Sequence, residues 1–372
     1  MEKSLSNKLS IFKTIYLILV GIFITGLLCE LYFVFERRWS GQRVVKYVKD
    51  NVSIYSARVL AEANVSPLWE IPGKKYKADV VLDKTIGKQR YIIKINRYGF
   101  RTKEFQMQKP AGIYRIICIG ASTTVQGNTN DDTYPAILEK KLNKRYPGLE
   151  IEVLNFGISA ILSDYWLHDL EGLFKFQPDL IIQYDVVNDI CWRYLSWRNN
   201  TCTNKVRYLL RRGLNLSFLL QKLFPLDVSM FDKCFIQTLH NFKKISSEAE
   251  SRGVEYLVGS FAAPDYKLAS EDFREYLNYI VQNIWGRAFE LKYYASYYNL
   301  LSRYNSLYYR YVEQNNLHGV FVDKSISNPN LFVDICHMTP EGIEKLADTF
   351  YEGVLKIIDK KLALTAEIKN PY

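Results

Sequence analysis

The strongest constraint on the fold of this chain is an alternation between short apolar segments and amphipathic helical segments from residue 114 onward. The apolar, strand-like segments occur at residues 114–120, 151–157, 179–185, 254–261 and 319–323. Helical patterns lie between them, and a last helix has Thr339 as its cap and begins with Pro340. Strands that alternate with helices build a parallel sheet with helices on both faces. We therefore predict a flavodoxin-like, three-layer α/β/α fold.

A second segment, at residues 14–35, is apolar over about the length that a helix needs to cross a bilayer. Its one charge, Glu30, lies near its end, and Arg37, Arg38 and Trp39 follow as an interfacial anchor. We predict a single transmembrane helix. A cleaved signal peptide is the alternative, although no A-x-A-like site follows. Basic residues flank the segment on both sides, so the positive-inside rule does not decide its orientation. The commoner arrangement predicts a cytoplasmic tail and an extracytoplasmic domain.

These segments divide the chain into three predicted parts. Residues 1–36 are the tail and membrane anchor, and residues 111–365 are the α/β domain, with an irregular insertion at about 192–232. Residues 37–110 lie between them and show a helical pattern at 40–64, then strand-like alternation that closes on the sequence YGFR at 98–101. We expect this middle part to be a membrane-proximal adaptor or stalk.

Charge and cysteine content argue against several classes of partner. The chain carries 49 Lys and Arg residues against 39 Asp and Glu, a formal net charge of +10. The basic residues are spread along the chain without a nucleic-acid motif, so we expect no nucleic-acid partner. The six cysteines form no C-x-x-C pair, although Cys191 and Cys202 could pair with each other. We predict no metal and no cofactor.

Groups suited to nucleophilic catalysis stand at the ends of predicted elements. Ser122 follows Gly120 and Ala121, where the first strand of the alternation ends and a helix begins. A hydroxyl there faces the crevice at the carboxyl edge of a parallel sheet, beside the N–H groups of a helix start. Asp334 and His337 lie three residues apart before the last helix, so the carboxylate can orient an imidazole that takes the serine proton.

Two further loops at the same sheet edge carry candidate oxyanion donors. Gly157 follows the second strand and offers an unhindered backbone N–H, and Asn188 follows the third strand and offers a side-chain amide. These are the donor types that an oxyanion hole uses. Either residue alone is also what an ordinary turn or helix cap contains.

Together these blocks resemble those of the SGNH hydrolases, which carry Ser, Gly, Asn and His on successive loops with an Asp three residues before the His. The resemblance covers about residues 115–346. The chain is similar to a branch of this family that is often membrane-tethered. This similarity lies in the sequence GASTTVQG, followed by TYPAILEKKL, and in the preceding YGFR. The resemblance implies Ser122 as nucleophile and oxyanion donor, Gly157 and Asn188 as the other donors, His337 as general base and Asp334 as its orienting acid.

Two positions depart from the pattern of that family. Ala121 replaces the Asp of the GDSL signature, which removes no proposed catalytic group, and Val186 replaces a Gly, which can reshape the third loop. The order Ser, Asp, His also suits an α/β-hydrolase, but Thr124 stands where the G-x-S-x-G elbow has its second Gly. The three-residue spacing of Asp and His also favours the SGNH pattern.

The resemblance implies a serine esterase or deacylase acting on an ester-bearing substrate, and an anchored domain outside the membrane would meet O-acylated glycans. An O-acyltransferase with the same residues and a catalytically silent, membrane-tethered assembly protein are the alternatives. Residues 271–312 hold thirteen Phe, Trp and Tyr residues at helical spacing. This spacing is typical of a helix packed into a core, although tyrosines can also stack on sugars.

Overall fold

The structure is a computed structural model that describes residues 11–29, 31–32, 35, 75–86, 89–191, 193, 228–281, 291 and 293–369. The chain divides into two units, Met1–Tyr47 with Ser196–Asp227, and Val48–Leu195 with Val228–Tyr372. The helix predicted at 40–64, Cys202 and most of the insertion predicted at 192–232 lie outside the described residues. The domain boundaries drawn from the sequence stay predictions.

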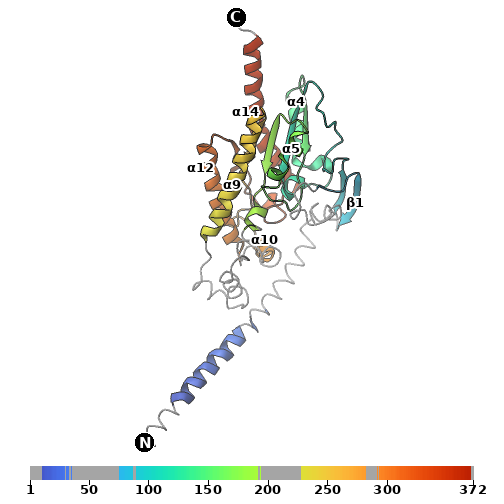
Figure 1. Cartoon of the computed structure of the whole chain (residues 1–372). Coiled ribbons are helices and arrows are strands. Elements are labelled where there is room, and N and C mark those ends of the chain that lie inside the picture. Colours follow the sequence, from blue (N-terminus) through green and yellow to red (C-terminus); the bar gives the residue numbers. More distant parts are fainter. Residues whose placement is uncertain are drawn as a thin grey trace, which may run out of the picture. The chain divides into compact units, whose positions relative to one another are not determined.

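In the first unit the structure describes helix Ile11–Cys29, drawn in blue in Figure 1. Its 19 residues and mean hydropathy of 2.2 suffice by length and composition to cross a membrane, and none of this helix is buried inside the protein. A signal sequence near an N-terminus meets the same criteria. The apolar segment therefore forms a helix. That this helix anchors the protein in a membrane stays a prediction.

The second unit contains a five-stranded parallel sheet in the order β4-β3-β5-β6-β7. Its strands are β3 (Ile113–Gly120), β4 (Glu150–Asn155), β5 (Leu180–Tyr184), β6 (Glu255–Gly259) and β7 (His318–Val320). Numbered along the chain, this order is 2-1-3-4-5, which is the flavodoxin-like arrangement. The predicted fold class is confirmed, and ligands are expected outside the carboxyl ends of β3 and β5, where the strand order reverses.

The central strands β3 and β5 are mostly apolar because both faces of the sheet are covered. All five residues of β5 are buried, as are the last seven of the eight residues of β3. Helix α4 (Tyr134–Arg145) packs against β4 and α14 (Pro340–Lys369), and α9 (Val228–Ser251) packs against β6 and α12 (Tyr294–Gln314). Figure 1 shows α9 and α12, in yellow and orange, beside each other.

Two segments predicted to be helical are interrupted. Residues 164–176 form a 3-10 turn, η4 (Trp166–His168), and a short helix, α5 (Leu170–Phe174), because Asp169 between them has non-helical angles. The described part of residues 271–312 contains α10 (Glu271–Tyr279) and α12, and Tyr293 is extended just before α12. The interpretation of the aromatic residues as core side chains is confirmed for α12, which buries Tyr294, Tyr297, Tyr304 and Tyr308.

The segment before the sheet forms an antiparallel hairpin of β1 (Val80–Ile86) and β2 (Gln89–Ile95). One face of β2 buries Tyr91, Ile93 and Ile95. The N–H of Ile92, between them, donates to the carbonyl oxygen of Asn128 at 2.9 Å. The hairpin therefore packs on the α/β part of the second unit, beside the loop that follows Ser122.

Candidate active site

A tight turn between β3 and α3 (Ser122–Val125) places Ser122 at the carboxyl edge of the sheet. Gly120 ends the strand at a φ of 156°, and a Cβ at that position would lie 2.5 Å from the carbonyl oxygen of Tyr184. This strand end therefore requires glycine. Ser122 is half-buried and is the first residue of α3, where backbone N–H groups have no partner within the helix.

The side chain of His337 joins Ser122 and Asp334 in one relay. Its Nε2 lies 2.9 Å from Ser122 Oγ, and its Nδ1 lies 2.8 Å from Asp334 Oδ2. The other carboxylate oxygen of Asp334 accepts the backbone N–H groups of His337 and Cys336 at 2.7 and 2.9 Å. The structure thus brings together three predicted side chains, two of which are separated by 215 residues.

Gln126 ties the loop that carries His337 to the nucleophile turn. Its Oε1 accepts the N–H of Met338 at 2.7 Å, and its Nε2 donates to the carbonyl oxygen of Thr123 at 2.9 Å. The side chain is buried, so both bonds are shielded from water. Sequence reasoning missed Gln126 because a lone glutamine after a serine carries no signal for such a role.

The charge of Asp334 follows from its surroundings. Burial by itself raises the pKa of this carboxyl, but the neighbouring His337 and the N–H groups of His337 and Cys336 hold the pKa below its ordinary value. Asp334 is therefore ionised at neutral pH and favours the His337 tautomer with a proton on Nδ1. In that tautomer Nε2 carries the lone pair that accepts the proton of Ser122.

The same loop offers potential metal ligands. A carboxylate oxygen of Asp334, the Sγ of Cys336 and a ring nitrogen of His337 all lie within 4.8 Å of one another. Burial, together with the charge of Asp334, raises the pKa of the Cys336 thiol well above its ordinary value. A metal binds the thiolate, which this environment disfavours. Because Asp334 and His337 already bond each other and Ser122, the cluster fits a proton relay better than a metal site.

The two predicted oxyanion donors, Asn188 and Gly157, differ in whether another residue of the protein already accepts their hydrogen bond. The Nδ2 group of Asn188 donates one hydrogen to the carbonyl oxygen of Ile161 at 2.9 Å, and no acceptor among the described residues takes its second hydrogen. The N–H of Gly157 already donates to Asn155 Oδ1 at 3.0 Å, so it does not offer the open donor that we expected. Gly157 has a packing role instead, because a Cβ there would lie 2.8 Å from the Cβ of Thr124.

Ala160 is a donor that sequence reasoning missed. Its φ is 67°, a left-handed conformation that is rare for alanine. The N–H of its neighbour Ser159 donates to Tyr76 Oη, and the carbonyl oxygen of Ile161 accepts from Asn188, whereas the N–H of Ala160 has no acceptor among the described residues. The backbone N–H of Ala160 is thus a candidate oxyanion donor, one residue before the Ile161 carbonyl that Asn188 contacts. An alanine in the sequence gives no sign of a left-handed turn, so only the backbone shows this donor.

The loop that carries Asn188 is held by hydrogen bonds on both sides of that residue. Val186 is buried, and its carbonyl oxygen accepts the N–H of Ile190 at 3.1 Å, which starts a helical turn through Asn188. The next residue, Asp189, accepts the N–H and the hydroxyl of Ser163 at 2.9 and 2.6 Å. These bonds hold the third loop against the second, with Asn188 between them.

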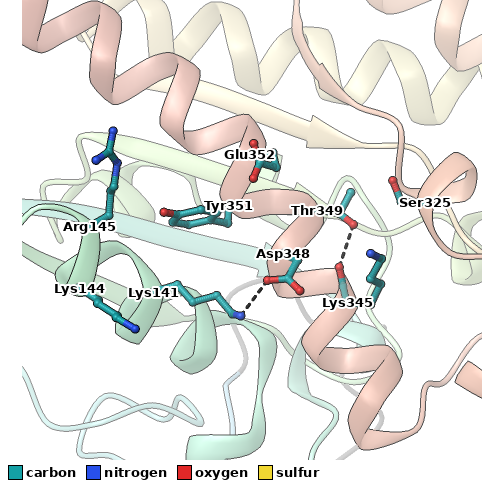
Figure 2. A pocket seen from close by; sticks show the side chains of 9 residues that line it. All are labelled: Lys141, Lys144, Arg145, Ser325, Lys345, Asp348, Thr349, Tyr351 and Glu352. Atoms are coloured by element: carbon teal, nitrogen blue, oxygen red, sulfur yellow. Dashed lines mark hydrogen bonds and ion pairs between the residues drawn. The ribbon is translucent and has the colours of Figure 1, made fainter.

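A hollow of about 700 Å³ lies elsewhere, between α4 and α14. Figure 2 shows its charged lining, in which Lys141 pairs with Asp348 at 2.8 Å. Lys144, Arg145, Lys345 and Glu352 complete the charged groups, and no predicted site residue lines this hollow. It is therefore separate from the relay of Ser122 and His337.

No family model matches this chain, and no curated protein matches it. Solved structures do resemble it. A catalytic mutant of an acetylxylan esterase from Geobacillus stearothermophilus is 16% identical, with a TM-score of 0.39, over 65% of this chain and 94% of that one. An alpha/beta hydrolase from the metagenome of Lake Arreo is 17% identical, with a TM-score of 0.39, over 67% and 97%.

A protein from Desulfitobacterium hafniense assigned to the G-D-S-L family of lipolytic proteins is 10% identical, with a TM-score of 0.38, over 64% of this chain and 98% of that one. These identities and scores are too low to indicate a substrate for this chain. Independently of them, the sheet order and the loop positions of Ser122, Asn188, Asp334 and His337 are those that the resemblance to the SGNH hydrolases implies.

Proposed function

We propose that this protein is a membrane-anchored serine esterase that removes O-linked acyl groups, with Ser122, His337 and Asp334 as its catalytic triad. The observation that carries the proposal is the unbroken relay from Ser122 Oγ through His337 to the buried Asp334, with distances of 2.9 and 2.8 Å. Such a relay activates a serine hydroxyl, which by itself is a weak nucleophile.

In the first half of the proposed reaction, Ser122 Oγ attacks the ester carbonyl carbon while His337 Nε2 takes the hydroxyl proton. The negative charge then moves to the carbonyl oxygen, where the N–H of Ser122, the amide of Asn188 and the N–H of Ala160 can donate to it. The C–O bond to the alcohol breaks, and His337 returns the proton to the departing alcohol oxygen. The acyl group remains on Ser122.

In the second half, His337 takes a proton from water, and the resulting hydroxide attacks the acyl-enzyme. The bond to Ser122 Oγ breaks, His337 protonates that oxygen, and the carboxylic acid leaves. Asp334 stays ionised throughout and stabilises the imidazolium that forms in each half. The steps thus use only the side chains and backbone N–H groups named above, the ester and water.

We also propose that a membrane helix anchors the protein and that its substrates are glycans. Support for an anchor comes from helix Ile11–Cys29, whose apolar side chains are exposed along its length. A domain tethered outside the membrane would meet ester-bearing glycans, so we propose O-acylated glycans as substrates. Alkaline carbonate extraction of membranes tests the anchor, because a cleaved signal peptide would leave the protein in the supernatant.

The chemistry is tested with the full chain in detergent, a fluorophosphonate probe and an aryl acetate. We expect labelling and turnover in the wild type and neither in Ser122→Ala. His337→Ala should lose turnover, and Ser251→Ala, which changes an exposed serine on α9, should behave as the wild type. Labelling that persists in Ser122→Ala would overturn the assignment.

The acceptor is tested in the same preparation with an O-acetylated polysaccharide. Release of free acetate supports hydrolysis. Acetate that appears instead on an added, unacetylated oligosaccharide would show that a sugar hydroxyl replaces water, and the protein would then be an acyltransferase with the same triad.

A further inference from the structure

The six-residue turn at 96–101 is locked into one conformation. Asn96 Oδ1 accepts the N–H groups of Tyr98 and Phe100, each at 3.0 Å. Gly99 has a φ of 80°, and a Cβ there would lie 2.6 Å from the carbonyl oxygen of Tyr76. The turn therefore needs this asparagine and this glycine, and it presents the next two side chains in fixed directions.

The first of these side chains is Phe100, which packs onto the second catalytic loop. Its ring is fully buried and stacks on Phe156 with centroids 3.7 Å apart and planes within 7°. Phe156 directly precedes Gly157 in the loop after β4. The hairpin segment thus supplies part of the apolar support beneath this loop.

The second is Arg101, which is buried without an ion pair among the described residues. Its guanidinium donates to the carbonyl oxygens of Val125, Gly127 and Thr129, with the last two bonds at 3.0 and 2.8 Å. Burial lowers the pKa of Arg101 to about 10, so the group stays charged at neutral pH. A buried charge is costly unless its donors are satisfied, and here backbone carbonyls satisfy them.

These carbonyls belong to the segment that carries the nucleophile. Val125 is the last residue of α3, which begins with Ser122, and Gly127 and Thr129 follow in the same loop. A planar group with several fixed donors holds three carbonyls at set distances, which a single-point charge such as lysine does not do. Arg101 therefore fixes the far end of the nucleophile turn.

Tyr76, from the same segment, fixes the oxyanion loop. Its hydroxyl accepts the N–H of Ser159 at 2.8 Å and donates to Ser159 Oγ at 3.2 Å. Ser159 directly precedes Ala160, whose N–H is an open donor. The tyrosine is buried, so water does not replace it in these bonds.

We propose that Tyr76 and Arg101 form a positioning clamp through which the segment before the α/β domain holds the nucleophile turn and the oxyanion loop in register. The clamp makes residues 75–101 part of the catalytic framework rather than a passive connection to the N-terminal helix. The dependence of turnover on the clamp rests on the esterase function proposed above. The geometric claim, that the clamp orders these two loops, does not.

The test compares Arg101→Lys and Tyr76→Phe with Arg97→Lys in the full chain. Arg97 is the matched control because it lies in the same turn but pairs with Glu104 at the surface. We expect about a tenfold to hundredfold fall in kcat for Arg101→Lys, with KM within about twofold of the wild type, because small displacements of a nucleophile cost rate rather than ground-state binding. Tyr76→Phe should lower kcat by about tenfold, and Arg97→Lys should change neither constant.

Hydrogen exchange separates failure of the clamp from failure of the proposed function. Faster amide exchange at residues 122–130 in Arg101→Lys, and at 158–162 in Tyr76→Phe, supports the clamp even if the wild type turns over no ester. Wild-type exchange and wild-type kcat in both variants would overturn it. If Arg101→Lys does not fold, Tyr76→Phe decides, because the loss of one hydroxyl leaves the core packing intact.

Discussion

Replacement of Asp334 by Asn is the sharpest perturbation of the proposed relay, because the two side chains have nearly the same shape. Asp334 accepts three hydrogen bonds, two from backbone N–H groups and one from His337 Nδ1. In Asp334→Asn, the amide oxygen can still accept the two backbone bonds, but the amide nitrogen then faces Nδ1 as a donor. His337 is forced into the tautomer with its proton on Nε2, where it faces Ser122 and cannot accept a proton.

The expected magnitude follows from that tautomer. The corresponding change in a serine protease triad lowers kcat by about 10⁴-fold, equivalent to about 5.4 kcal/mol of transition-state stabilisation. We expect a loss of this order in the kcat for an aryl acetate, measured on the full chain in detergent, with KM little changed. Circular dichroism should show a folded protein, because the buried shape is preserved.

A matched control exists at the opposite edge of the sheet. Asp179 also accepts a backbone N–H, from Arg115 at 2.8 Å, but it precedes β5 and is remote from the relay. Asp179→Asn should therefore keep wild-type kcat per folded molecule. If Asp334→Asn retained more than about a tenth of the wild-type kcat, the carboxylate would not be orienting the base, and the assignment of Asp334 would be wrong.

Three further outcomes are expected. Gly157→Ala should lower the free energy of unfolding by about 1–3 kcal/mol in urea titrations, because the new Cβ would meet the Cβ of Thr124 at 2.8 Å and Val125 Cγ1 at 2.9 Å; unchanged stability would contradict the close packing. Ala160→Gly should raise the free energy of unfolding by about 1 kcal/mol, because glycine adopts a φ of 67° without the penalty that alanine incurs; a loss of stability would refute the left-handed assignment. Because the pKa of Asp334 is lower in the folded chain than in the unfolded one, its ionisation stabilises the fold above its ordinary pKa, and this contribution disappears as the pH falls through the lowered value. The difference in unfolding free energy between the wild type and Asp334→Asn should accordingly shrink as the pH falls below about pH 4; a difference that grew as the pH fell below this value would contradict the lowered pKa.

The proposed clamp also changes the interpretation of residues 75–101. The sequence suggests a connection between membrane and enzyme, and YGFR stands out there only by its similarity to a family segment. In the structure, Gly99, Phe100 and Arg101 contribute in three different physical ways, through a left-handed turn, a stacked ring and a set of bonds to backbone carbonyls. If the proposed clamp is correct, substitutions here lower the turnover of the enzyme.

The sequence alone was enough to predict the parallel sheet and the relay. Strands β3 and β5 are buried on both faces, so they appear as mostly apolar runs, interrupted by Arg115 in β3 and by Gln183 in β5. The helices between them have apolar faces of their own. Ser122, Asp334 and His337 could be identified because each is a reactive or ionisable residue next to the end of a strand or the start of a helix. In a parallel sheet, the loops at these positions meet at one edge. Local pattern and topology together determine these features.

The tertiary structure decided which polar groups are occupied and which are open. Gly157 was expected to donate to an oxyanion, but Asn155 takes its N–H, and Ala160 offers one instead. The clamp could not be predicted either, because Tyr76 and Ser159 are separated by 83 residues and neither carries a local signal. The residue type shows only that a donor or acceptor exists. Which partner it bonds depends on distances and directions between residues that are remote in sequence, and only the tertiary structure fixes these.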